Sequence, residues 1–344
     1  MKAYYKRHLL NFKTPSGTSR GVLTQKETWY LIIEHQGRKG VGECGILRGL
    51  SYDDRDGYEQ KLEWVCQNIS KGAHFLWDEL KEWPSIQFGV ESAFASLESV
   101  NPFILFPSKF TSGDDSISIN GLVWMGSKEA MLNQITEKIK SGFSCIKLKI
   151  GAINFDHELQ LLEYIRAKFD ANEIEIRVDA NGAFSYNDAL DKLNKLAGFQ
   201  LHSIEQPIAK NQHDSMSVLC KSTSLPIALD EELIGVTDLQ GKGHILDRIK
   251  PQYIILKPSL VGGFRGSQEW IDAATERNIG WWITSALESN IGLNAIAQWT
   301  YTLKNPMPQG LGTGSLYTNN IGSPLEVENG KLHYRSASSW DFTF

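Results

Sequence analysis

The sequence predicts an α/β protein, a TIM-type (β/α)7β barrel with an N-terminal α+β capping domain. The chain has 344 residues, enough for about two domains at roughly 150 residues each. Strand-like segments precede helical ones in the first hundred residues, whereas short apolar strands alternate with helices from about residue 116. In that second part, polar residues or glycines at the predicted strand ends recur every 25 to 30 residues. These three observations define the fold class.

The predicted capping domain covers residues 1–112. Residues 20–43 read as two β-strands around a glycine-containing turn at His35–Arg38. Apolar residues at helical spacing predict a helix over residues 58–69, and a second helix is expected over residues 88–97. Strands followed by helices are typical of a small α+β domain.

The predicted barrel covers residues 113–317. A barrel of about 250 residues with eight units needs roughly 30 residues per unit, which matches the observed spacing. The chain becomes loop-like after Gly314, so the eighth strand is expected to lack its helix. An open, doubly wound sheet is the structural alternative. The predicted strand ends are Asn120, Lys149, Asp179, Glu205, Asp230, Lys257, Ser285 and Gly312.

The C-terminal tail, residues 318–344, is expected to return to the capping domain. It carries a hairpin signal at Asn329–Gly330. We therefore count it with residues 1–112 rather than with the barrel.

Charge and composition exclude several classes of protein. With 35 basic and 40 acidic residues the net charge is −5, which offers no basic surface for nucleic acid or an anionic membrane. The four cysteines stand far apart, which argues against a zinc site and fits a reducing cytoplasm. The longest uncharged stretch, residues 305–325, is rich in glycine, proline and asparagine and unlike a membrane helix. We expect a cytoplasmic protein, and its oligomeric state stays open.

Charged residues occupy consecutive predicted strand ends, where barrel enzymes place their active sites. Lys147 and Lys149 are two residues apart, so on a strand both point to one face. Three carboxylates buried together repel one another unless a cation lies among them. Oxygen ligands alone favour Mg²⁺, with Mn²⁺ as a possible substitute. The alternative is a solvated belt of ion pairs. The charged positions are Lys147, Lys149, Asp179, Glu205, Asp230 and Lys257.

Five segments in this region, KLKIG, RVDANGAF, IEQP, ALDEEL and LKPSLVGG, resemble the enolase superfamily and its muconate-lactonizing branch. A GxGE turn at Gly40–Glu43 in the capping domain extends the resemblance. It implies that Lys149 is the catalytic base and that Lys257 lies on the opposite side of the substrate. By the same resemblance, the Mg²⁺ ligands are Asp179, Glu205 and Asp230. We expect substrate contacts from Lys147, Asn181, Ser285 and Gly312.

Finer similarities in residues 86–93, 285–299 and 310–332 imply a particular reaction of this superfamily. It is the Mg²⁺-dependent loss of water from 2-succinyl-6-hydroxy-2,4-cyclohexadiene-1-carboxylate, which gives o-succinylbenzoate for menaquinone biosynthesis. Lys149 would remove the α-proton, the metal would stabilise the enediolate, and water would leave from the same face. The enzyme would then be a carbon–oxygen lyase whose partner is a small carboxylate.

Several alternatives remain open. A dipeptide epimerase or N-acylamino acid racemase would use Lys149 and Lys257 on opposite faces of the substrate. Muconate cycloisomerisation is a third reaction, and a barrel without catalysis would serve only to bind a ligand. Residues 15–20 and 47–52 are expected to form the capping loops that choose the substrate.

Two further sequence patterns argue against particular folds and enzyme branches. Residues 40–45 match GxGxxG, but no helix start follows them, so a dinucleotide-binding fold is not expected. None of the eight histidines stands at a charged strand end, which argues against the mandelate racemase branch.

Overall fold

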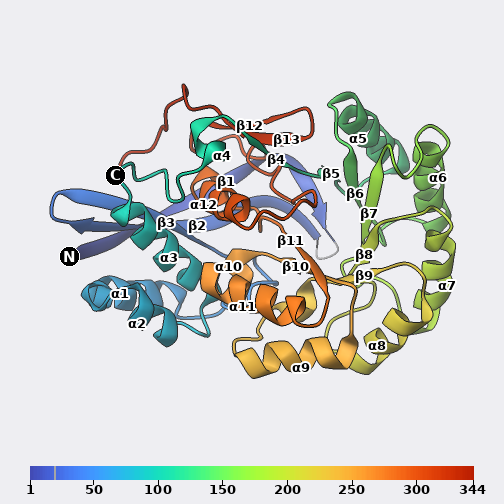
Figure 1. Cartoon of the computed structure of the whole chain (residues 1–344), viewed down its shortest axis with the longest axis horizontal. Helices are drawn as coiled ribbons and strands as arrows, with labels where there is room; N and C mark the ends of the chain where they lie inside the picture. The colour runs from blue at the N-terminus through green and yellow to red at the C-terminus, as the bar shows by residue number, and fades with distance from the viewer. Residues whose placement is uncertain (19–20) are drawn as a thin grey trace.

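The computed structural model describes residues 1–18 and 21–344 and contains an antiparallel capping sheet and a curled parallel sheet (Figure 1). The capping sheet has the order β1 (Lys2–Thr18), β2 (Gly21–His35), β3 (Arg38–Gly45). Between β2 and β3, Gln36 and Gly37 have φ angles of 48° and 77°, as tight hairpin turns require. The predicted turn at His35–Arg38 is confirmed.

Strand β1 is missing from the sequence prediction. It pairs with β2 from Lys2 opposite Glu34 to Asn11 opposite Gln25, and again near Ser16 after an irregularity in register. Among residues 1–16, only Leu10, Phe12 and Ser16 are buried. A strand at the sheet edge with so few buried side chains lacks the apolar alternation by which strands are recognised.

Helices α1 (Tyr58–Asn68), α2 (Ala73–Glu79) and α3 (Pro84–Glu98) complete the capping region. The predictions of α1 and α3 are confirmed, although α3 begins four residues earlier because Pro84 suits the first helical position. Helix α3 lies directly on β3. A Cβ at Gly42 would stand 2.0 Å from the carbonyl oxygen of Gly89 in α3. The GxG pattern therefore serves close packing of a strand on a helix, not a dinucleotide.

Asp53 gives the stability of this region a testable pH dependence. Its carboxylate is fully buried and accepts hydrogen bonds from the backbone N and the hydroxyl of Ser85, at 2.9 and 2.6 Å. Burial raises the pKa of Asp53 to about 6 from 3.8, although Ser85 opposes the shift. The folded protein then binds a proton that the unfolded chain releases between these pH values, so this contribution to stability falls as pH rises.

We expect the Asp53→Asn variant to lack that contribution. Relative to the variant, the wild type should lose stability on the order of 3 kcal/mol between about pH 4 and pH 6. Urea unfolding of both proteins at several pH values measures this difference. Parallel stability curves for the two proteins would show that Asp53 has an ordinary pKa.

Seven parallel strands form the curled sheet, in the order β11-β10-β9-β8-β7-β6-β5. Helices lie on its outer side (Figure 1), which is the arrangement predicted for the barrel. The strands are β5 (Gly121–Val123), β6 (Cys145–Lys149), β7 (Glu175–Asp179), β8 (Ser203–Glu205), β9 (Ile227–Leu229), β10 (Tyr253–Leu256) and β11 (Gly280–Ile283). The helices are α5 (Lys128–Lys140), α6 (Phe155–Arg166), α7 (Tyr186–Ala197), α8 (His213–Ser222), α9 (Leu239–Ile249), α10 (Pro258–Val261), α11 (Gly263–Thr275) and α12 (Asn290–Thr302).

The eighth predicted strand is reduced to a seam, which we define as residues 309 and 310. Gln309 makes a parallel bridge to Ile119, and Gly310 makes one to Thr284. Backbone hydrogen bonds of 2.8 to 3.0 Å accompany both bridges. The seam thus joins β11 to the chain entering β5 and closes the barrel, but within the described residues it is not a strand that ends at Gly312.

Asn120 was also expected at a strand end, and this prediction is wrong. Asn120 lies between β4 (Ser116–Ser118) and β5, because β4 pairs with the C-terminal hairpin instead of joining the barrel. The charged residues predicted at strand ends lie there. Lys149, Asp179 and Glu205 are the last residues of β6, β7 and β8, and Asp230 and Lys257 directly follow β9 and β10.

The C-terminal tail contacts both parts of the molecule. Strands β12 (Leu325–Glu328) and β13 (Lys331–Tyr334) form the predicted hairpin, with positive φ at Asn329 and Gly330, and β13 pairs with β4. The ring of Phe342 packs edge-on against Tyr30 of β2, with 5.3 Å between centroids. The division into domains at residues 112 and 317 stays a prediction. In the part of the chain that the structure describes, no helix has the length and apolarity to span a membrane.

Candidate active site

A cavity of about 220 Å³ lies at the carboxyl ends of the barrel strands, beneath the capping sheet. Its lining includes seven of the nine residues predicted for the site. The two others, Glu205 and Asp230, are 2% exposed and contact lysines that do line the cavity. The seven are Lys147, Lys149, Asp179, Asn181, Lys257, Ser285 and Gly312.

Lys147 and Lys149 both point to the carboxylate of Asp179, as their spacing on one strand predicts. Lys147 Nζ lies 3.0 Å from Asp179 Oδ2 and forms a second ion pair with Glu205. Lys149 Nζ lies 3.3 Å from the same Asp179 oxygen. Asp179 on β7 is therefore shared by the two lysines of β6.

Lys257 completes the ring from the other side. Its ammonium forms an ion pair with Asp230 and stands 3.9 Å from Glu205 Oε1. Its side chain is 13% exposed, and that of Lys149 is 11% exposed, so both can meet a ligand in the cavity. Three buried carboxylates thus face three lysines, and the charges of the ring balance.

The electrostatics of the ring differ between its carboxylates. Burial works against the charge of Asp179, but Lys147, Lys149 and Lys257 outweigh it and hold the pKa of Asp179 below its usual range. For Glu205, burial and repulsion by Asp179 outweigh the lysines and raise the pKa well above its usual range. A further cation beside Glu205 would therefore stabilise its charged form.

The donor set fits the predicted divalent cation. Glu205 Oε1 is buried and has no hydrogen-bond partner among the described residues. In residues 1–18 and 21–344, no group of three or more carboxylates, imidazoles or thiolates is arranged to hold a metal ion. Lys147 and Lys257 form ion pairs with the carboxylates of the ring. The ligands available are nonetheless carboxylate oxygens from three consecutive strands, which suit a hard cation. Asp179, Glu205 and Asp230 are the residues that would hold it.

Asn181 lines the cavity, and its contact with substrate stays a prediction. Its Oδ1 accepts a hydrogen bond from Lys149 Nζ at 2.7 Å. Its Nδ2 donates to Glu231 Oε1 at 3.0 Å. Asn181 and Glu231 therefore orient Lys149. Sequence reasoning missed Glu231, although it directly follows Asp230.

The opposite wall comes from the end of β11 and the segment after the seam. Ser285 Oγ and Thr313 Oγ1 are 2.6 Å apart and hydrogen-bonded. Gly312 also lines the cavity, and a Cβ there would stand in ordinary contact with Ile119, at 3.4 Å. Trp124, which the sequence analysis did not single out, also lines the cavity, with its ring centre 5.9 Å from Lys149 Nζ.

The capping loops contribute in part as predicted. Within the loop 47–52, Leu47, Arg48 and Leu50 line the cavity. From the other loop, residues 19 and 20 lie outside the described residues, and the lining begins at Gly21. The Arg48 guanidinium pairs with Glu27 and, at 2.6 Å, with Asp54.

Three residues in the loops that follow the barrel strands have left-handed backbone conformations although they are not glycine. They are Asn181 (φ 44°), Gln206 (φ 39°) and Leu287 (φ 63°). For such residues the conformation costs about 1–3 kcal/mol and persists only where the surroundings enforce it. Asn181 is held by the hydrogen bond from its own backbone N to Asp179 Oδ1, at 3.0 Å.

A barrel with lysines and carboxylates at successive strand ends defines a class of enzymes, and the comparisons identify it. Residues 130–338 match the family described as Enolase C-terminal domain-like. The chain belongs to this family. Its relatives include the o-succinylbenzoate synthase of Desulfotalea psychrophila, 46% identical across 96% of this chain and 98% of the relative. The o-succinylbenzoate synthase of Bacillus subtilis is 25% identical across 93% of this chain and 88% of the relative.

Solved structures agree. The crystal structure of MenC from Desulfotalea psychrophila has a TM-score of 0.86 at 42% identity, covering 97% of this chain and 99% of that one. Muconate lactonizing enzyme from Pseudomonas fluorescens reaches 0.84 at 21% identity, over 99% of this chain and 96% of that one, which shows the common fold. The predicted fold, superfamily and enzyme class, a carbon–oxygen lyase, are confirmed.

Proposed function

We propose that this chain removes water from 2-succinyl-6-hydroxy-2,4-cyclohexadiene-1-carboxylate to form o-succinylbenzoate for menaquinone biosynthesis. The observation that carries the proposal is the 46% identity to an o-succinylbenzoate synthase over 96% of the chain. The site supports it, because two lysines reach one cavity from opposite sides of a carboxylate ring.

The substrate carboxylate would lie at the ring of charged residues. Asp179, Glu205 and Asp230 would hold a divalent cation, which when bound would stabilise the negative charge that develops as the α-proton leaves. Lys147 is 7% exposed, so it acts mainly by neutralising Asp179 and Glu205. Ser285 and Thr313 offer hydroxyl groups, and Gly312 leaves room for the substrate beside the seam.

Lys149 would move the proton in both steps. As a neutral amine it takes the α-proton, the C–H bond breaks, and the electron pair stays on the substrate. The ammonium formed then gives that proton to the hydroxyl group on the same face, the C–O bond breaks, and water leaves as the ring becomes aromatic. Asn181, 2.7 Å from Lys149 Nζ, holds the amine in place through both steps.

Lys257 would contribute charge and position rather than a proton. Its ammonium lies on the side of the cavity formed by Asp230, across the ring from Lys149. A cation there can face the π-system of the substrate ring. A dehydration in which both proton transfers occur on one face needs no second base.

The Lys257→Arg variant tests this assignment. Arginine keeps the positive charge but is effectively never deprotonated, so we expect partial dehydratase activity, limited by the bulkier head group. Exchange of the substrate α-proton with solvent deuterium, followed by NMR, should persist because Lys149 is intact. Loss of both turnover and exchange, with the cavity still binding product, would assign proton transfer to Lys257.

The alternative is an epimerase of dipeptides or N-acylamino acids. The observation in its favour is that lysines from both sides reach the same cavity, as a two-base reaction requires. The L-Ala-D/L-Glu epimerase of Bacillus subtilis is also a relative, 23% identical across 83% of this chain and 80% of the relative.

A two-substrate assay separates the functions. The purified enzyme with Mg²⁺ is offered the cyclohexadiene carboxylate and, separately, a panel of dipeptides and N-acylamino acids in deuterated water. We expect turnover of the first. Two-sided deuterium exchange on the second panel, without dehydration, would replace the proposed function by the epimerase.

A further inference from the structure

The segment Ser285–Ser289, between β11 and α12, forms one wall of the candidate site. Ser285, Ala286 and Leu287 line the cavity. Leu287 is left-handed, and its carbonyl oxygen accepts a hydrogen bond from Tyr317 at 2.6 Å. Because leucine has no intrinsic preference for this conformation, contacts elsewhere must maintain the wall.

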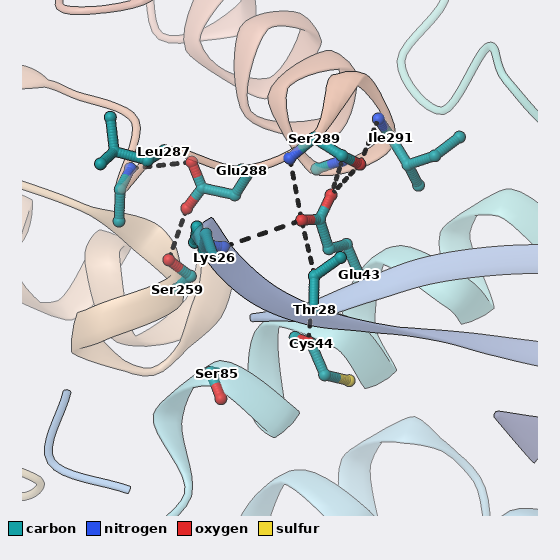
Figure 2. A network of polar contacts seen from close by, with 12 residues as sticks. Lys26, Thr28, Glu43, Cys44, Ser85, Ser259, Leu287, Glu288, Ser289 and Ile291 are labelled. Carbon is teal, nitrogen blue, oxygen red and sulfur yellow. Dashed lines mark hydrogen bonds and ion pairs between the residues drawn. The ribbon is translucent and has the colours of Figure 1, made fainter. Parts of the chain in front are cut away.

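One group of these contacts comes from the capping sheet. Glu43 of β3 is fully buried, and its carboxylate lies at the N-terminus of α12 (Figure 2). It accepts hydrogen bonds from the backbone N of Ser289 at 2.9 Å and of Gly292 at 2.8 Å. The hydroxyl groups of Ser289 and Thr28 also donate to it. A residue of one region thus satisfies the helix start of the other.

Lys26 and Glu288 extend this contact toward the cavity. Lys26 Nζ is buried 4.0 Å from Glu43 Oε1, with no hydrogen-bond acceptor among the described residues. Glu288 accepts hydrogen bonds from Ala286 N at 2.8 Å and from Ser259 Oγ at 2.5 Å. Figure 2 shows Lys26 with both carboxylates.

The cluster of Lys26, Glu43 and Glu288 therefore contacts two segments of the site. Ala286 belongs to the wall, and Ser259 lies in α10, two residues after Lys257. Glu43 and Glu288 are both buried, and the charge of Lys26 acts on both of them, so each charge depends on the others. Glu43 and Glu288 each accept several hydrogen bonds, and buried carboxylates satisfied in this way restrict the motion of the segments that donate to them.

We propose that Glu43 is a positioning residue, through which the capping sheet fixes the Ser285–Ser289 wall and the start of α10 behind Lys257. Glu43 does not line the cavity, so it acts through Ser289, Lys26 and Glu288. The kinetic part of the test rests on the proposed function, whereas the structural part does not.

The test compares four variants with wild type. Glu43→Gln keeps the shape but removes the charge, and Lys26→Met removes the cation. The double variant Lys26→Met/Glu43→Gln removes both, and Ser289→Ala is the mildest change, should Glu43→Gln fold poorly. The readouts are amide hydrogen exchange of peptides covering residues 284–292, and kcat and KM for the cyclohexadiene carboxylate.

We expect exchange in residues 284–292 to become about tenfold faster in Glu43→Gln, with kcat/KM lower by about the same factor, mainly through KM. Ser289→Ala should change both in the same direction but less. Lys26→Met leaves two buried carboxylates, Glu43 and Glu288, without their cation, and adding Glu43→Gln removes one of them. The fall in kcat/KM of the double variant should therefore be smaller than the product of the two single falls.

Glu59→Gln is the matched control. Glu59 is also a carboxylate of the capping region, but it accepts hydrogen bonds from Trp29, at 3.0 Å, and from Tyr5, and none from the described residues of the barrel. It should leave exchange in residues 284–292 unchanged. Unchanged exchange there in Glu43→Gln, or an equal effect of Glu59→Gln, would overturn the inference. Inactivity of the wild type on the cyclohexadiene carboxylate would instead overturn the proposed function, since the exchange readout needs no substrate.

Discussion

The Lys149→Ala variant should lose about 10²–10⁴-fold in kcat, the range expected when a general acid/base is removed. Lys149 is the lysine closest to the mouth of the barrel on β6, and its amine is held at 2.7 Å by Asn181. In the proposed reaction it carries the proton in both steps, so its removal should affect both of them. Steady-state rates and solvent deuterium exchange on the substrate measure the loss.

Lys147→Ala is the informative comparison. Lys147 neutralises Asp179 and Glu205 and is more deeply buried, so its removal should raise KM and reduce stability more than it slows the proton transfer. Lys149→Ala should still fold, because its side chain has fewer ionic partners. A Lys149→Ala enzyme within a few-fold of wild type would remove Lys149 from the role of base.

Removal of divalent cations should abolish turnover, and added Mg²⁺ should restore it. The physical reason is that Glu205 is buried beside Asp179 and Asp230, and its Oε1 has no hydrogen-bond donor in the described part of the chain. Treatment with a chelator, dialysis, and back-titration with Mg²⁺ or Mn²⁺ form the experiment. Binding measured by calorimetry on the protein alone gives a readout that does not depend on turnover.

Asp230→Asn provides the control for that experiment. It keeps the shape of the site but removes one carboxylate, so the affinity for Mg²⁺ should fall while the fold remains. Full activity after thorough chelation would mean that the three lysines alone neutralise the ring, and the metal would then have no part in the reaction.

The charged ring could be predicted from the sequence because parallel strands bring their carboxyl ends to one edge. Lys149, Asp179 and Glu205 end their strands as the 25-to-30-residue spacing indicates. The lysine pair was assigned to one face by its two-residue spacing, and the shared contact with Asp179 confirms this. Local signals are also present at α7, where Ser185 caps the helix by accepting a hydrogen bond from Asp188 N.

Other features had no local signal. Strand β1 is recognisable only by its pairing with β2, because few of its side chains are buried. Asn120 resembles a strand end, but the preceding segment pairs with a hairpin more than two hundred residues further on. The partners of Asn181 and of Glu43 depend on tertiary contacts, Glu231 in one case and Ser289 in the other.

The seam at residues 309 and 310 bears on the order in which this protein folds. One bridge joins Gly310 to Thr284, just after the last strand of the parallel sheet, and the other joins Gln309 to Ile119, just before the first strand. Ile119 and Gln309 are distant in sequence, so their contact forms only after a large loss of chain entropy, and a few backbone hydrogen bonds return little of it. The cylinder must therefore close late, after the neighbouring β–α units have assembled one upon another.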